Sequence, residues 1–281
     1  MTILVITVIL LSMIWIARSI MVAGPIGEKV AIIDIIGAIS NSEPIIEHIH
    51  RYRDDRSVKA IVLRIDSPGG SVAPVQEIYS ELNKLEKPIV ASMGGTAASG
   101  GYYIACAADQ IFANPGTLTG SIGVIMQFMK MKGLYDKVGL DQEVVKSGEF
   151  KDFGSPVRSL TDKERALLQE TIDDVHTQFV DAIFEGRSDH LVREEIVALA
   201  DGRIFSGRQA LESKLVDRLG NLPDAIDLAA ELGGIVGVPK ITRVKPKPSL
   251  LERLLGFKGT QKLNRFLNSG PSFHYELYFG N

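Results

Sequence analysis

Residues 89–105 read I-V-A-S-M-G-G-T-A-A-S-G-G-Y-Y-I-A and place Ser99 among small neighbours. The apolar run 89–93 is typical of a buried strand, and the residues after Ser99 predict the start of a helix. The small neighbours allow an extended peptide backbone to approach the Ser99 hydroxyl. A helix N-terminus presents free N–H groups and a partial positive charge, which stabilise an adjacent oxyanion. This stretch therefore has the setting that a nucleophilic serine needs.

The sequence around this stretch alternates between strand and helix patterns. Mainly apolar runs predict further strands at 29–39, 60–65, 110–113, 123–128 and 142–146. Helical patterns occur at 45–53, 75–82, 161–185, 191–199 and 250–255, and an aromatic, strand-like piece at 273–279. Thr161 and Glu164 form a capping-box pattern at the start of the longest helix. The alternation predicts an α/β fold with parallel strands.

Composition narrows the range of functions. The chain has 281 residues, of which 45% are hydrophobic and 23% charged, as in an ordinary globular protein. Its net charge of -3 differs from the excess positive charge that is typical of nucleic-acid-binding proteins. The single cysteine, Cys106, excludes an intrachain disulfide framework and a thiolate metal cage. The sequence also lacks a P-loop and an H-E-x-x-H motif, so we expect no cofactor and no metal.

The first 24 residues differ in composition from the rest. Residues 3–17 are almost all Ile, Leu, Val, Met and Trp, and apolar residues resume at 20–23 after Arg18 and Ser19. A membrane-spanning helix needs about 20 apolar residues, and Arg18 can snorkel to the bilayer surface. No basic residue precedes the run, which argues against a cleaved signal peptide. We therefore predict a single membrane anchor at 1–24.

Functional groups of α/β proteins gather at the carboxyl ends of parallel strands. Three loops follow predicted strands: 66–71, 94–101 and the loop from Lys146 onward. We therefore expect these loops to meet at one edge of the sheet. The first loop contains Gly69 and Gly70, and adjacent glycines allow backbone N–H groups to point into a site. Such amides form an oxyanion hole without side chains. A tight turn at the strand end is the alternative interpretation.

A nucleophilic serine also needs a base. None of the histidines lies in a strand-end loop, which disfavours a Ser-His-Asp triad: His48, His50, His176, His190 and His274. The segment V-V-K-S-G-E-F-K-D-F-G-S-P (144–156) instead carries Lys146 and Lys151. A lysine acts as a base when desolvation or a nearby cation lowers its pKa from about 10.4 toward neutrality. Phe150 and Phe153 are candidates for an apolar wall, whereas Asp152 opposes such a shift unless it turns away.

The motifs together resemble one family. They closely resemble the signal peptide peptidase SppA family in its short, single-unit form. The motifs that carry the resemblance are D-S-P-G-G-S (66–71), T-A-A-S-G-G-Y-Y-I-A (96–105), T-L-T-G-S-I-G-V (117–124), K-S-G-E-F-K-D (146–152) and D-G-R-I-F-S-G-R-Q-A (201–210). The resemblance covers residues 28–225 and leaves 226–281 as a basic, aromatic C-terminal extension. It implies a Clp-protease-like, crotonase-like α/β spiral with an N-terminal transmembrane helix.

The resemblance also implies roles for individual residues. Ser99 matches the family nucleophile, and Lys151, rather than Lys146, matches the general base. Gly70 and Gly100 fall where the oxyanion-hole amides are expected, with Gly69 supporting the turn. Ser121 is placed to accept a hydrogen bond from the lysine, with a plain turn serine as the alternative. In the family the Ser-Lys dyad is completed between neighbouring subunits of a ring, so we expect a homo-oligomer here.

These expectations describe a membrane-anchored serine endopeptidase that cleaves remnant signal peptides and other apolar peptides. The resemblance places its catalytic part outside the cytoplasm, on the inner or plasma membrane. Two alternatives belong to other functional classes. An acyl-CoA hydratase or isomerase of the crotonase type also uses paired backbone amides, but it has no use for Ser99 with Lys151. A non-catalytic membrane scaffold predicts a degenerate dyad, whereas both residues are present.

Overall fold

A computed structural model of the chain describes residues 27–244 and 274–276. The predicted anchor at 1–24 and the helix predicted at 250–255 lie outside the described residues. Within the described part, no helix combines the length and the apolar character needed to cross a membrane.

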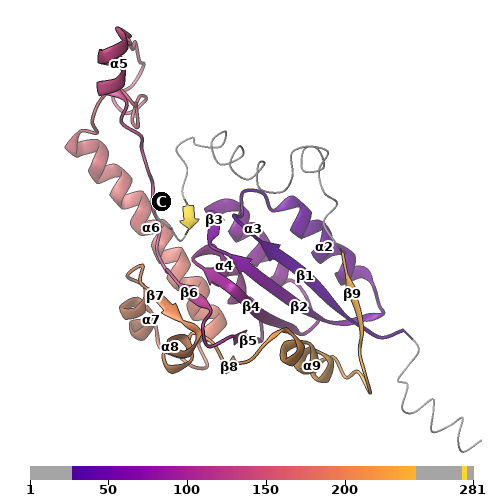
Figure 1. Cartoon of the computed structure of the whole chain (residues 1–281). Helices are drawn as coiled ribbons and strands as arrows, with labels where there is room; N and C mark the ends of the chain where they lie inside the picture. The colour runs from indigo at the N-terminus through magenta and orange to yellow at the C-terminus, as the bar shows by residue number, and fades with distance from the viewer. Residues whose placement is uncertain (1–26, 245–273, 277–281) are drawn as a thin grey trace, which may run out of the picture.

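The body is built on a twisted sheet that is mostly parallel (Figure 1). Its path runs β7 (Ile204–Ser206), β6 (Leu118–Gly120), β4 (Ile89–Ala98), β2 (Val58–Ser67), β1 (Lys29–Ile36) and β9 (Lys240–Arg243). Strand β5 (Gln110–Ala113) pairs with β4, and β8 (Arg218–Leu219) pairs with β5. Only the β6–β7 pair of this described sheet is antiparallel. The prediction of an α/β fold rich in parallel strands is therefore confirmed.

Helices cover both faces of the sheet, because its central strands are apolar on both sides. Ile33 and Ile35 of β1 face a large core that includes residues of α2 (Glu43–Asp54), α3 (Val72–Asn83), α4 (Gly100–Ala105) and α6 (Asp162–Arg187). Val30 and Ile32, at alternate positions, face a second core under α9 (Leu222–Leu232). Short elements α7 (Arg193–Leu199) and α8 (Gly207–Glu212) complete the body beside β7.

An arm extends from this body (Figure 1). The chain leaves β6, runs beside α6 to α5 (Lys132–Val138), and returns to the start of α6. The strands predicted at 123–128 and 142–146 are wrong: neither segment forms a strand. Val124 packs against the large core, but Ile125 is 38% exposed and Val145 is 96% exposed. The capping box at the start of α6 is confirmed, with reciprocal hydrogen bonds between Thr161 and Glu164.

The described parts of the C-terminal extension join the body. The boundary proposed at 225/226 falls inside α9, and β9 adds a parallel strand beside β1. The strand expected in the aromatic tail forms as β10 (His274–Glu276), which pairs with β3 (Gly69–Ser71) in antiparallel register. The tail therefore reaches the glycine loop that the sequence singles out.

Candidate functional site

Ser99 lies where β4 ends and α4 begins, in a backbone conformation rare for a side-chain-bearing residue. Its φ is 54° and its ψ is -119°. Residues held in such regions cost about 1–3 kcal/mol each and concentrate at functional sites. Two hydrogen bonds hold the turn: Ser99 N donates to Gly120 O at 2.7 Å, and Tyr103 N donates to Ser99 O at 2.9 Å.

The Ser99 hydroxyl is buried and has no hydrogen-bond partner among the described residues. The residue is 1% exposed, and its Oγ makes no hydrogen bond to any described residue. Leaving a buried polar group unsatisfied costs about 1–3 kcal/mol, so a native structure that retains one calls for an explanation. A nucleophilic hydroxyl provides that explanation, because its partners in the reaction are a base and a substrate.

Ser121 lies on the neighbouring strand end. Strands β4 and β6 pair in parallel, with Ala98 opposite Gly120, so the residues that follow each pair are also neighbours. Ser121 also has a positive φ, 50°, and its N–H donates to Arg203 O at 2.8 Å. It is 9% exposed. The structure therefore brings Ser121 to the same strand-end region as Ser99.

Strand β3 forms the other side of the site. Gly69 O accepts from Ile39 N at 2.8 Å, and Ser71 N donates to Ile39 O at 2.8 Å. Backbone polar groups alternate sides along a strand, so the N–H and C=O of Gly70 point away from Ile39. A Cβ on Gly70 would lie 2.0 Å from Ile39 O, which makes glycine necessary there. The Gly69 N–H is already used, because it donates to Ser67 Oγ at 3.0 Å.

The outward edge of β3 pairs with an extended strand. Tyr275 of β10 lies opposite Gly70, and His274 lies opposite Ser71. Figure 1 shows β10 beside β3, and α4 adjoins both strands. Gly100 is the first residue of α4, where a helical N–H has no partner inside its own helix. This edge of β3, which adjoins the helix that begins after Ser99, therefore accepts an extended strand, as its pairing with β10 shows.

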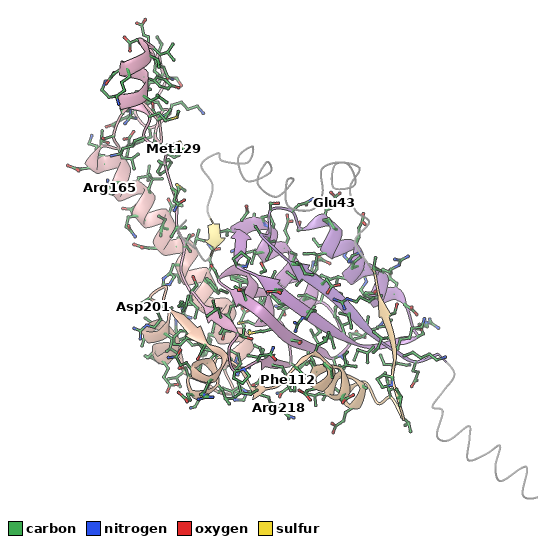
Figure 2. All side chains as sticks on the ribbon, in the orientation of Figure 1. Glu43, Phe112, Met129, Arg165, Asp201 and Arg218 are labelled. Atoms are coloured by element: carbon green, nitrogen blue, oxygen red, sulfur yellow. The ribbon has the colours of Figure 1, made fainter. Side chains whose placement is uncertain are left out.

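Lys151 lies away from Ser99 within one chain. The loop that carries it is bound to the start of α6, since Arg158 Nη1 donates to Glu164 Oε2 at 2.8 Å. Farther along α6, the Phe179 ring lies 4.9 Å from Tyr103 of α4. The helical rise between Glu164 and Phe179 is about 22 Å. Figure 2 shows Met129 and Arg165 out on the arm, away from the sheet.

The expectation that the three loops meet at one sheet edge is therefore corrected. The loops at 66–71 and 94–101 do meet, because β2 and β4 are neighbours in the sheet. The loop from Lys146 does not join them, because residues 142–146 form no strand and belong to the arm.

Apolar and charged residues flank Lys151 in the sequence of the arm, and Lys151 itself is exposed. Phe153 packs edge-on against Phe128, with ring centroids 6.3 Å apart, yet Phe153 stays 41% exposed and Phe150 37%. The carboxylate of Asp152 binds Arg158 Nη2 at 2.8 Å and Lys146 Nζ at 2.7 Å. Hydrogen bonds from Arg158 and then Lys146 lower the pKa of Asp152 below its ordinary value. The carboxylate next to Lys151 is thus engaged elsewhere.

The histidines with described side-chain contacts have other partners. His50 binds Glu81 at 2.7 Å, His176 binds Ala200 O at 2.9 Å, and His190 lies 3.3 Å from Asp217. A cavity of about 440 Å³ beside His190 and Arg187 contains none of the predicted site residues. No group of metal-ligating side chains occurs among residues 27–244.

Comparisons with known proteins agree on one family. The model of "Peptidase family S49" matches residues 81–235, more than half of the chain, and that of "Clp protease" matches residues 10–118. The parallel-rich α/β sheet fits the Clp-protease-like fold.

Several relatives are similar along much of the chain. A "Putative protease" of Synechocystis sp. is 44% identical over 82% of this chain and 83% of its own length. "Serine protease SPPA, chloroplastic" of Arabidopsis thaliana is 34% identical over 82% of this chain and 36% of its own. A "Putative signal peptide peptidase SppA" of Enterococcus faecium is 38% identical over 66% of this chain and 55% of its own.

Proposed function

The chain belongs to peptidase family S49 and is a serine-type peptidase, and we propose that it is a membrane-anchored endopeptidase with a Ser99–Lys151 dyad. A hydrolase of this family is neither an acyl-CoA hydratase nor a non-catalytic scaffold, the two alternatives raised by the sequence.

The reaction is acyl transfer to Ser99. Ser99 Oγ attacks the scissile carbonyl while Lys151 Nζ accepts the hydroxyl proton, and the same proton then passes to the leaving amine. The backbone amides of Gly70 and Gly100 stabilise the oxyanion. Water then attacks the acyl-enzyme, again with Lys151 as base, and releases the second product. Ser121 accepts a hydrogen bond from the lysine and orients it.

The buried Ser99 Oγ carries this proposal, because it makes no hydrogen bond to any described residue and precedes α4, which adjoins β3. A peptide that pairs with β3 as β10 does lies in extended conformation along the Gly70 amide. Strand pairing recognises backbone rather than side chains, which suits a peptidase acting on varied sequences. A hydroxyl in a strained turn is held ready for attack on such a strand.

A second copy of the chain supplies the lysine. The arm that carries Lys151 leaves large apolar side chains in solvent, including Met129 at 70%, Val138 at 58% and Leu140 at 57% exposed. Packing against a neighbouring body would cover this surface and bring Lys151 to the neighbour's Ser99. Repetition of such a head-to-tail contact closes into a ring.

Remnant signal peptides and other apolar segments are the proposed substrates. The apolar residues 3–17 and 20–23 form the proposed anchor, which keeps the site near peptides released in the membrane. The family resemblance supports a catalytic part outside the cytoplasm. The name of the Enterococcus relative supports this substrate class.

The test is cleavage of apolar peptides by the purified full-length protein and its variants. Ser99→Ala and Lys151→Ala are each expected to lower kcat by roughly 1000-fold or more. Lys146→Ala, the competing lysine on the same loop, is expected to retain most of the cleavage. Loss of cleavage in Lys146→Ala but not in Lys151→Ala would move the base to Lys146. Equal cleavage by all proteins would remove the dyad altogether.

A further inference from the structure

Two carboxylates flank Lys151 in the sequence, Glu149 and Asp152, and neither pairs with it. Glu149 binds Lys163 at 3.1 Å, and Asp152 binds Arg158 and Lys146. Among the described residues, no acidic group forms an ion pair with the Lys151 side chain. An adjacent carboxylate would stabilise the ammonium form and work against a lysine that must accept a proton.

Arg158 is the centre of this arrangement. Its Nε and Nη2 donate to the two carboxylate oxygens of Asp152 at 3.0 and 2.8 Å, and its Nη2 also reaches Asp152 O at 3.2 Å. Its Nη1 and Nη2 donate to Glu164 at 2.8 and 2.5 Å. Glu164 is 2% exposed and is fixed by the capping box of α6, so it provides a rigid anchor.

We propose that Arg158 is a positioning residue for Lys151, which holds the Asp152 carboxylate against the start of α6 and out of reach of the Lys151 ammonium. The inference rests on the proposed function, since it assigns Arg158 a role only if Lys151 is the base. The planar guanidinium binds each of the two carboxylates through a pair of donors, a two-pronged geometry that the ammonium of a lysine does not provide. The charges of Lys146, Asp152, Arg158 and Glu164 also cancel, so the network adds no net charge beside the base.

The network further fixes the backbone that carries Lys151. Among the described residues, the backbone hydrogen bonds between Gly148 and Ser155 are all long, from 3.2 to 3.3 Å. Phe128 supports the loop on another side, where a Cβ on Gly154 would lie 2.5 Å from its ring. Arg158 thus controls both the charge near Lys151 and the path of its loop, and these two effects are separable by experiment.

The experiment measures kcat/KM for an apolar peptide against pH in four full-length variants. Arg158→Gln removes the guanidinium that binds both carboxylate oxygens of Asp152 and leaves Lys146 on one of them. Asp152 is then able to pair with Lys151, which becomes neutral only at higher pH. We expect the acidic limb of this variant's kcat/KM–pH profile to move up by about one pH unit. In the double variant Arg158→Gln with Asp152→Asn, the limb is expected to return to the wild-type position. Arg158→Lys, which keeps a cation beside the buried Glu164, is expected to shift the limb less in the same direction.

Arg243→Gln is the matched control, because Arg243 makes a similar two-pronged contact with Asp34 on β1. Its acidic limb is expected to stay at the wild-type position. A limb that stays unchanged in Arg158→Gln and Arg158→Lys, with activity lowered equally at every pH, would overturn the inference and leave a merely structural arginine. The same limb shift in the double variant as in Arg158→Gln would also overturn it. Failure of the proposed function is distinct, since Lys151→Ala would then remain active.

Discussion

Ser99 N donates a hydrogen bond of 2.7 Å to Gly120 O and so ties the end of β4 to the end of β6. This bond holds the serine in its positive-φ turn and brings Ser121, the next residue after Gly120, to the same place. The site is therefore built on the ends of paired strands, where backbone hydrogen bonds fix the geometry.

Replacing Ser99 by glycine should relieve backbone strain. Glycine adopts positive φ readily, whereas alanine in the same conformation keeps the strain. We expect Ser99→Gly to have a free energy of unfolding about 1 kcal/mol higher than Ser99→Ala, although neither cleaves peptides. Urea unfolding of the two variants measures the difference. A Ser99→Gly protein less stable than Ser99→Ala would show that the turn is unstrained.

Gly70 is expected to tolerate no side chain. The Cβ of alanine would lie 2.0 Å from the backbone oxygen of Ile39, so β3 has to shift. We expect Gly70→Ala to lower the free energy of unfolding by about 2 kcal/mol and to abolish cleavage. Gly116→Ala is the control, because no atom of the described residues, its two chain neighbours aside, lies within 4 Å of its added Cβ. Equal stability and activity of the two variants would refute the close approach.

The tail strand β10 occupies the edge of β3 that a substrate is proposed to use, so it should compete with peptides. A chain ending at residue 270 is expected to have a KM several-fold lower with kcat unchanged. Tyr275→Pro should act in the same way without truncation, since proline cannot donate a strand hydrogen bond. Steady-state kinetics measure both variants. An unchanged KM in both would mean that substrates do not use this edge.

Glu164 links the stability of the arm to pH. Its pKa is lowered from 4.5 to about 2, first by the hydrogen bonds from Arg158. A lowered folded-state pKa adds stability that is present above pH 4.5 and is lost as the pH falls toward 2. We therefore expect Glu164→Gln to lose part of the acid sensitivity of unfolding between these values. The carboxylate of Glu149 is 61% exposed, so Glu149→Gln should leave the slope of the free energy of unfolding against pH unchanged. Equal slopes in all three proteins would contradict the assignment.

Most of the body was predictable because its strands and helices show strong patterns. The runs at 60–65 and 89–93 lie within β2 and β4, and the Thr161–Glu164 capping box starts α6. The glycine pair at 69–70 and the serine at 99 were recognisable from small residues at strand ends.

The arm was not predictable in the same way. Residues 123–128 and 142–146 have apolar patterns typical of strands, yet neither segment forms a strand in the described part of the chain. The spacing of apolar residues does not identify the surface against which an apolar segment packs. It therefore gives no information on whether that surface belongs to the same chain or to a neighbouring subunit. The role of Arg158 was missed for a related reason. Its contacts with Asp152 and Glu164 combine a loop with a helix start, and no spacing rule signals them.

If Ser99 of one copy works with Lys151 of another, two inactive variants should restore each other's activity when they are mixed. Ser99→Ala and Lys151→Ala are co-expressed in equal amounts, purified together and assayed with an apolar peptide. In a randomly assembled ring, about one junction in four pairs an intact serine with an intact lysine, so about a quarter of wild-type cleavage should return. A mixed protein that forms the same oligomer but is no more active than either variant alone would contradict the shared site.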